Sequence, residues 1–229
     1  PETKWMRGKN KDGKFQSPFN PLKWGDAFTE GNSLHYTWSV FQDFEGLVQL
    51  IGGKEAFEKK IDEVFEMPPL FDDSYYGFTI HEIREMQLVG MGNYAHGNQP
   101  IQHLIYLYHY AGKPEKVQTK LREVMDKLYS PTPDGYCGDE DNGQTSAWYV
   151  FSALGFYPVT PASDNYVLGT PLFKTETLQL PAGKKFLIKN VSRNPNSPLV
   201  EYVQLNGRQV EGFEIPFAAF RENGTLTFF

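Results

Sequence analysis

A loop with three adjacent acids carries the strongest chemical signal in this sequence. Asp139, Glu140 and Asp141 stand in a row in the segment 135–143, which glycines open and close. Glycine lets a backbone turn sharply and approach a ligand closely, and a helical pattern begins directly after this loop, at Thr145. Capping that helix would need only one acid. Three acids therefore predict a functional carboxylate cluster.

Glu30 is a second candidate, because it precedes a glycine and lies close in sequence to Tyr36 and Trp38. A carboxyl group among aromatic side chains tends to hold its proton and can serve as a proton donor. A solvated loop glutamate is the competing interpretation, and the residue type alone favours it.

His81 and Glu82 form a polar pair in a predicted loop-to-helix segment. The zinc-protease motif is excluded there, because Glu85 stands where the second histidine would have to be. The pair is suitable for binding a ligand, and an ordinary surface pair is an equally good interpretation of the residues alone.

Segment 96–103 gathers polar side chains at a predicted helix start, among them Asn98 and Gln99. Amide oxygens at such a place can ligate a hard cation, although capping by Asn98 is the simpler alternative. The acidic loop does not match a calcium EF-hand, because its glycine is one position early and Val150 replaces the last ligand.

These residues must be positioned by helices up to about residue 158. Apolar spacing and glycine or proline stops predict helices at 36–51, 54–66, 80–87, 100–110, 115–129 and 145–154. For the last of these, the spacing predicts an apolar face of Ala147, Val150, Phe151 and Leu154.

Alternating polar and apolar residues replace the helical pattern after Pro158. They predict strands at 166–168, 177–180, 186–189, 199–205, 213–215 and 225–228. Asn206-Gly207 is a strong hairpin signal. The chain is therefore expected to be mainly α with a small antiparallel β region at its C-terminal end.

Composition excludes several classes of protein. With 28 acids against 22 Lys and Arg, the formal charge is −6, and no basic patch points to nucleic acid. Cys137 is the only cysteine, so there is no internal disulfide. No apolar run reaches the length of a membrane span, and the first residues lack a signal-peptide pattern. We expect the chain to be a piece of a longer one.

The sequence resembles the glycoside hydrolase family 92 exo-α-mannosidases. The similarity lies in several blocks that occur in the family's order and cover most of residues 1–173. The longest block covers residues 138–158 and is highly specific. It begins with Gly138-Asp-Glu-Asp-Asn-Gly-Gln144 and ends at Pro158. The other matching blocks are 28–32, 36–38, 81–82, 96–100 and 106–114.

The resemblance implies a fold and a missing partner. Enzymes of this family combine an N-terminal β-sandwich with an (α/α)6 catalytic barrel. Residues 1–158 would form the C-terminal half of that barrel, part of an α/α toroid, and residues 159–229 a β-rich tail. The remaining N-terminal part of the enzyme would then be a necessary partner.

The resemblance also implies catalytic roles. Glu30 matches the general acid, Asp141 the general base, and Asp139 the carboxylate beside the base. Family members invert the anomeric configuration, and this mechanism needs two carboxyl groups on opposite sides of the sugar.

Two further pairs carry over by position. His81 and Glu82 match the pair that contacts the leaving-group sugar in α-1,2-mannosidases, and Asn98 and Gln99 fall in the block associated with calcium. Some relatives have glutamate at position 99, so Gln99 removes one charge from that block.

The expected function is a calcium-dependent, inverting exo-α-1,2-mannosidase, a hydrolase (glycosidase) of carbohydrate metabolism. It would release mannose from mannose-rich glycans, as in N-glycan degradation, in an extracytoplasmic (periplasmic or secreted) bacterial setting. One alternative is another (α/α)6 glycosidase or phosphorylase without calcium; another is a non-catalytic carbohydrate-binding or structural fragment. Two glycosylation sequons, Asn190-Val-Ser192 and Asn223-Gly-Thr225, are present by pattern only.

Overall fold

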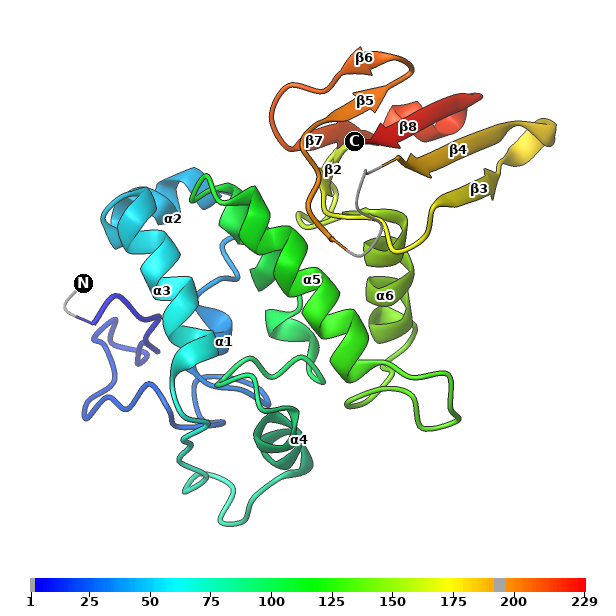
Figure 1. The fold of residues 1–229 in the computed structure, drawn as a ribbon. Coiled ribbons are helices and arrows are strands. Elements are labelled where there is room, and N and C mark those ends of the chain that lie inside the picture. Colours follow the sequence, from blue (N-terminus) through cyan, green and yellow to red (C-terminus); the bar gives the residue numbers. More distant parts are fainter. Residues whose placement is uncertain (1–2, 192–196) are drawn as a thin grey trace. The chain divides into compact units, whose positions relative to one another are not determined.

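A computed structural model of the chain describes residues 3–191 and 197–229 (Figure 1). The sequon that ends at Ser192 thus extends outside the described residues. The chain divides into two compact units, which are described separately. The first comprises Pro1–Leu104 and Lys127–Thr145, and the second Ile105–Asp126 and Ser146–Phe229.

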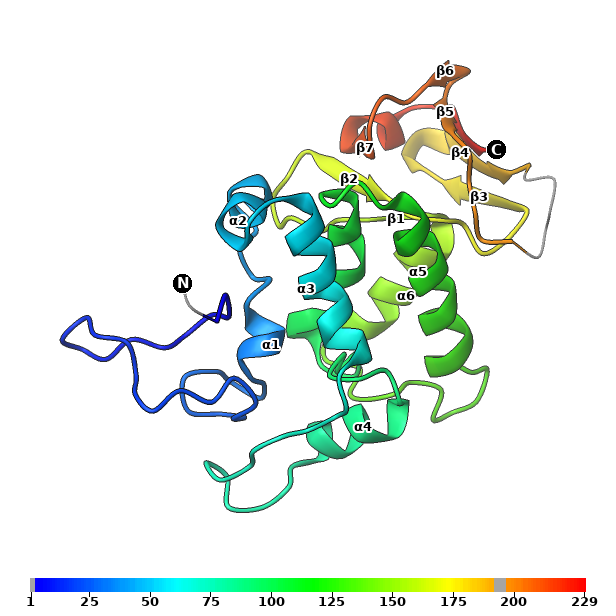
Figure 2. The ribbon, with the colours of Figure 1, turned by 60° about the vertical axis from the view of Figure 1, so that its left-hand side comes forward.

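The first unit holds the short helices that precede the acidic loop (Figures 1 and 2). They are α1 (Ser33–Tyr36), α2 (Phe44–Ile51), α3 (Lys54–Glu66), α4 (His81–Val89) and the 3₁₀ turn η1 (Gln99–Ile101). Helices α2 and α3 form a helical hairpin, and Gly52 ends α2 with a left-handed φ of 115°. The helix predicted at 54–66 is confirmed with the same bounds.

The single helix predicted at 36–51 is wrong, because the structure has two helices separated by residues 37–43. Each helix has its own N-terminal cap. The Asn32 side chain accepts hydrogen bonds from backbone N–H groups of α1, and the Asp43 carboxylate accepts one from Gly46 N–H at 2.7 Å. Capping of the orphan N–H groups by Asp43 starts a new helix inside a continuous apolar pattern.

A small apolar cluster supports α4 from within the first unit. It consists of Trp24, Ile80, Ile83, Met86 and Ala95, with Phe71 and Tyr76 packed against it. Ile83 and Met86 are the buried residues of α4, and His81 and Glu82 lie at its N-terminus.

The second unit contains most of α5 (Pro114–Leu128) and α6 (Gln144–Leu154), the 3₁₀ helix η2 (Leu104–His109), and all of the strands. The region predicted as a helix at 100–110 winds as 3₁₀ turns, η1 and η2. Periodicity over so few residues does not separate three-residue from four-residue winding.

The strands form two sheets, and each lies in the second unit. One has the order β1 (Phe156–Tyr157), β2 (Asn165–Leu168), β7 (Glu214–Pro216). The other has the order β3 (Thr175–Gln179), β4 (Lys185–Asn190), β8 (Gly224–Phe228), β5 (Val203–Leu205), β6 (Arg208–Gln209). The 3₁₀ turns η3 (Pro181–Gly183) and η4 (Phe217–Arg221) lie between strands.

The pairing of these strands confirms one prediction and corrects another. Asn206 and Gly207, with φ of 51° and 79°, make the tight turn between β5 and β6. Strands β4 and β8 pair in parallel, so the β region is not entirely antiparallel as predicted. The other strand pairs are antiparallel.

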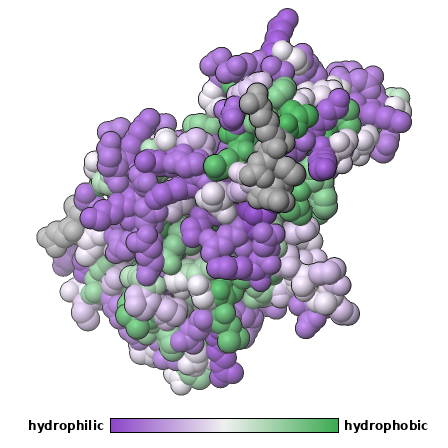
Figure 3. Space-filling view, viewed as in Figure 1, coloured by the Kyte–Doolittle hydropathy of each residue, from purple (hydrophilic) through white to green (hydrophobic). Residues whose placement is uncertain are grey.

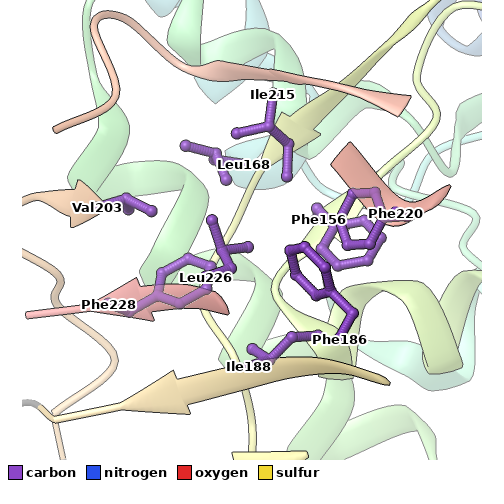
Figure 4. Packing of buried hydrophobic residues seen from close by; sticks show 9 residues of the cluster. All are labelled: Phe156, Leu168, Phe186, Ile188, Val203, Ile215, Phe220, Leu226 and Phe228. Carbon is purple, nitrogen blue, oxygen red and sulfur yellow. The ribbon is translucent and has the colours of Figure 1, made fainter. Parts of the chain in front are cut away.

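Aromatic and aliphatic side chains from both sheets fill the core of the second unit (Figure 4). Phe151 and Leu154 of α6 pack against this cluster. The rest of the predicted α6 face is wrong, because Val150 is 54% exposed whereas Trp148 is fully buried. Packing requires α6 to bury Trp148, a larger apolar side chain than either Ala147 or Val150.

Hydrophilic residues cover much of the face seen in Figure 3, and 22% of the residues in the sequence are charged. Among the described residues, every helix is too short or too polar to cross a membrane.

Candidate active site

Two glycines bring the acidic loop against the loop that carries Asn98 and Gln99. A Cβ atom added to Gly138 would lie 2.4 Å from the carbonyl oxygen of Gly97 and 2.5 Å from its Cα. Only glycine permits such an approach of two backbones. This contact lies within the first unit and joins the acidic loop to the block that the resemblance associates with calcium.

Within the acidic loop, the three acids have different tasks. Gly143 N–H donates to the carboxylate of Glu140 at 2.8 Å, so Glu140 closes the turn before α6. The backbone carbonyl of Asp139 accepts a hydrogen bond from the Thr145 hydroxyl, also at 2.8 Å. The side chains of Asp139 and Asp141 stay exposed and available for chemistry, and Asp141 has a left-handed φ of 46°.

Glu30 sits on a turn held by three separate side chains. Its N–H donates to the Tyr76 hydroxyl at 3.2 Å, and its carbonyl accepts a hydrogen bond from the Asn98 amide. The Tyr36 hydroxyl donates a hydrogen bond to the carbonyl of the preceding residue, Thr29, at 2.5 Å. Burial and the charge of Glu30 both raise the pKa of Tyr36. The turn thus fixes the backbone of Glu30 while its side chain remains exposed.

A cavity of about 490 Å³ brings Glu30 together with His81 and Glu82. We call it the Glu30 cavity, and its lining is completed by Tyr76, Phe78, Thr79, Ile80 and Arg84. The proton-donor candidate and the sugar-contacting candidates, separate in sequence, therefore share one hollow.

His81 connects this cavity to the acidic loop. Its Nε2 lies 3.1 Å from Asp139 Oδ2, and its Nδ1 lies 3.4 Å from Glu82 Oε2. Burial acts to lower the pKa of His81, but the hydrogen bond to Asp139 and the charges of Glu82 and Glu85 outweigh it and raise the pKa above 6.5. An imidazole between two carboxylates offers hydrogen-bonding groups of the kind that sugar hydroxyls need.

Asp141 does not line the Glu30 cavity among the residues that the structure describes. It lies two positions after Asp139, at the exposed end of the same loop. Asp139 is thus tied to His81, whereas Asp141 remains on the solvent side.

Glu85 is a further candidate that the sequence interpretation missed. It was considered only as a failed zinc ligand, yet its Oε2 is buried and no hydrogen-bond partner for it occurs in the described part of the chain. Burial raises the pKa of Glu85 to about 7. A Cβ on Gly97 would approach Glu85 Oε2 to 3.0 Å, so this oxygen lies directly beside the contact of the two glycines.

The predicted metal residues, Asn98 and Gln99, directly follow Gly97, which lies beside this oxygen. Their side chains differ in their hydrogen bonds. Asn98 is mostly buried, and its amide nitrogen holds the carbonyl of Glu30. Gln99 has a buried amide nitrogen for which the described residues supply no acceptor. The oxygen and nitrogen of an amide are assigned from their partners, so exchanging them would bury an oxygen at this position.

The two histidines of the same segment are structural. His96 lies between the hydroxyls of Tyr94 and Tyr129, at 2.8 and 2.7 Å, and burial lowers its pKa to about 3. His103 bonds the carbonyl of Trp38 at 2.9 Å. In the described part of the chain, no group of three or more His, Cys, Asp or Glu side chains could hold a metal ion.

The whole chain, residues 1–229, matches the glycosyl hydrolase family 92 catalytic domain. The chain belongs to this family. The family expected from the sequence blocks is therefore confirmed.

Two solved structures of the family are similar to this chain over nearly its whole length. The family GH92 inverting mannosidase BT2199 from Bacteroides thetaiotaomicron is 49% identical, with a TM-score of 0.82 over 98% of this chain. The family GH92 α-mannosidase BT3965 from the same organism, in complex with mannoimidazole, is 34% identical, with a TM-score of 0.86 over 99%.

The chain spans about 30% of the length of each of these solved chains. A more distant relative from Arthroderma benhamiae is named an uncharacterized secreted glycosidase. It is 25% identical over 191 residues, which are 82% of this chain and 21% of that protein. The chain is accordingly a portion of a family 92 glycosyl hydrolase catalytic domain.

Proposed function

We propose that this chain is part of a calcium-dependent, inverting exo-α-1,2-mannosidase that removes mannose from mannose-rich glycans. One observation carries the proposal: Glu30, His81 and Glu82 share a cavity, and His81 contacts Asp139 of the acidic loop. The printed descriptions of the two bacterial relatives, an inverting mannosidase and an α-mannosidase bound to mannoimidazole, support it.

Glu30 and Asp141 would act as acid and base. Glu30 would protonate the oxygen of the leaving group, while Asp141 removes a proton from the attacking water on the opposite face of the sugar. Asp139 would hold the acidic loop against His81 and keep Asp141 in place. Each carboxyl lies on a loop with a fixed backbone, which favours accurate positioning.

His81 and Glu82 would set the linkage preference. They are adjacent at the start of α4 and lie in the same cavity as Glu30, where they would contact the leaving-group sugar. An imidazole N–H donor beside a carboxylate acceptor can form hydrogen bonds with a pair of neighbouring hydroxyls. A sugar of the wrong linkage would leave these polar groups without partners.

The donor set fits calcium in its chemistry. Carboxylate and amide oxygens are the ligands that hard cations prefer, and the orphaned Glu85 oxygen and the Gln99 amide lie on the elements that meet at Gly97. Asn98, Gln99 and Glu85 would hold the ion, with Asp139 and Asp141 adding negative charge nearby. When bound, calcium would polarise mannose hydroxyls and favour a flattened ring.

The proposed function also requires a longer chain that completes the catalytic barrel. Residues 1–158 would form half of an (α/α)6 toroid and residues 159–229 a β tail, with the rest of the enzyme completing the barrel. The name of the relative from Arthroderma benhamiae, a secreted glycosidase, supports an extracytoplasmic location.

Assays on mannobioses of defined linkage test the proposal, using the full-length enzyme and the 229-residue chain separately. We expect the full-length enzyme to cleave the α-1,2 isomer fastest and to lose activity in EDTA, with calcium restoring it and zinc failing to do so. We expect the chain alone to be inactive.

Each alternative function gives a different result. Full activity after exhaustive chelation, or phosphorolysis in phosphate, would point to another (α/α)6 glycosidase or phosphorylase. Binding of mannose oligosaccharides without any cleavage by the full-length protein would point to a carbohydrate-binding role.

A further inference from the structure

Phe78 is an exposed apolar side chain in the lining of the Glu30 cavity, beside the charged side chains of Glu30, Glu82 and Arg84. Its side chain is 66% exposed, and the proposed function gives it no role although it lines the cavity. The other aromatic residue of the lining, Tyr76, is committed through its hydroxyl to the backbone of Glu30. Ile80 is buried in the cluster beneath α4. Phe78 is thus the ring that remains free to meet a ligand.

A tight turn holds Phe78 in this position. Backbone N–H groups of Tyr76 and Gly77 both donate to the carbonyl of Asp73, and Gly77 has a left-handed φ of 73°. The Thr79 hydroxyl donates to the Asp73 carboxylate at 2.6 Å, directly after Phe78. A ring projected from a hydrogen-bonded turn is preorganised, so contact with a ligand costs little additional ordering.

Sugars present two kinds of surface, and the Glu30 cavity offers a counterpart for each. Hydroxyl groups around the edge of a pyranose need charged or polar partners such as His81 and Glu82, which line the cavity. The C–H groups on the ring face are apolar and gain from contact with an aromatic ring, as other apolar surfaces do.

We propose that Phe78 is the stacking platform for the leaving-group sugar, and that it supplies affinity while His81 and Glu82 supply linkage preference. The inference rests on the proposed function. It assigns the leaving-group side of the site a hexopyranose held by one face on Phe78, next to the proton donor Glu30.

The test compares Phe78→Ala with the unchanged full-length enzyme on two α-mannosyl substrates, of which only one has a sugar ring as its leaving group. On α-1,2-mannobiose we expect kcat/KM to fall about tenfold, mainly through KM, the scale of one aromatic contact. On α-mannosyl fluoride, whose leaving group has no ring, we expect kcat/KM to stay within about twofold. An aryl mannoside is unsuitable because its aglycone would also stack.

Two further variants separate stacking from damage to the turn. Phe78→Trp should retain most of the activity on mannobiose, because an aromatic face remains. Phe173→Ala removes an aromatic side chain that is 54% exposed but does not line the cavity, and it should leave both substrates unaffected.

Other results would overturn the assignment. An equal loss on both substrates, or a lowered melting temperature that Phe78→Trp does not restore, would show that the ring supports the structure. Unchanged mannobiose kinetics would show that no sugar contacts it. If the unchanged enzyme cleaves neither substrate, the proposed function itself fails, which is a distinguishable outcome.

Discussion

At the scale of single residues, Glu30 and Asp141 have the same unusual backbone. Their φ angles are 48° and 46°, in a region that residues other than glycine seldom adopt. Such conformations cost of order 1–3 kcal/mol each, and they persist where the surroundings enforce them, often at functional sites. The hydrogen bonds of Tyr76 and Asn98 to the backbone of Glu30 are the local cause for one of them.

For these two residues we predict that Glu30→Gln and Asp141→Asn in the full-length enzyme each lower kcat on mannobiose by at least about 10²-fold. The two variants should differ on α-mannosyl fluoride, because fluoride leaves without a proton. Glu30→Gln should recover much of its rate there, and Asp141→Asn should not.

The matched control is Asp134→Asn, an exposed carboxylate shortly before the acidic loop. It should keep its activity on both substrates. Near-normal mannobiose kinetics in either test variant would remove that residue from its role.

Glu176 is a half-buried acid in the second unit that no catalytic role explains. Burial raises its pKa from 4.5 to about 7, and its Oε2 has no partner in the described residues. Since the folded state holds the proton more tightly, the associated stability is fully present below about pH 4.5. It is lost as the pH rises through about 7.

We therefore predict that Glu176→Gln, which mimics the protonated acid, stabilises the chain at pH 8 and has no effect at pH 4. The gain should be about 1 kcal/mol, because solvent screening reduces the full value. Chemical denaturation at the two pH values measures it. A stabilisation that is the same at both would show that the charge is not responsible.

The candidate site residues differ in whether the sequence alone could identify them. Glu30, His81 and Glu82 matched family blocks, and the structure places them in one cavity. Glu85 was missed because its significance depends on a close approach of Gly97 and Gly138. Contacts between residues so distant in sequence leave no local pattern.

At the scale of elements, the contact between Gly97 and Gly138 is the feature that assembles the site. We predict that Gly138→Ala destabilises the chain by about 1–3 kcal/mol, the usual cost of overpacking. Because the new methyl group pushes two loops of the site apart, we also expect kcat/KM of the full-length enzyme to fall at least about tenfold.

Gly112→Ala is the matched control. Gly112 has a φ of 73°, and an added Cβ would meet nothing within 4 Å, so this substitution carries conformational strain without a collision. It should reduce the melting temperature but not kcat/KM. If Gly138→Ala also leaves kcat/KM unchanged, the glycine contact does not position the site.

Secondary-structure elements were predicted correctly where the sequence pattern was long or a turn signal was strong. The 3.6-residue spacing of α3 and the Asn206-Gly207 turn were predictable from local chemistry. The strands β1 and β6 have only two residues each, too few for an alternating pattern. The parallel pairing of β4 with β8 joins strands distant in sequence, and each strand alone gives no sign of its partner.

At the scale of the whole molecule, the chain covers about 30% of the length of the bacterial relatives that it matches. Those relatives share its fold over nearly all of its residues. The acid, base and sugar-binding candidates all lie in one of its two compact units. The reaction of the complete enzyme is therefore tested most directly by its stereochemistry, which depends on how these carboxyl groups face the substrate.

We predict that the full-length enzyme releases β-mannose first from an α-mannoside. No residue of the site is placed as a nucleophile, and an inverting enzyme needs its carboxyl groups about 6.5–9.5 Å apart to admit a water, against about 5–5.5 Å for retention. Asp141 would orient that water while Glu30 protonates the leaving oxygen. Proton NMR in the first minutes, before mutarotation, identifies the anomer. Release of α-mannose first would refute both the base role of Asp141 and the inverting mechanism, because two displacements would then have occurred.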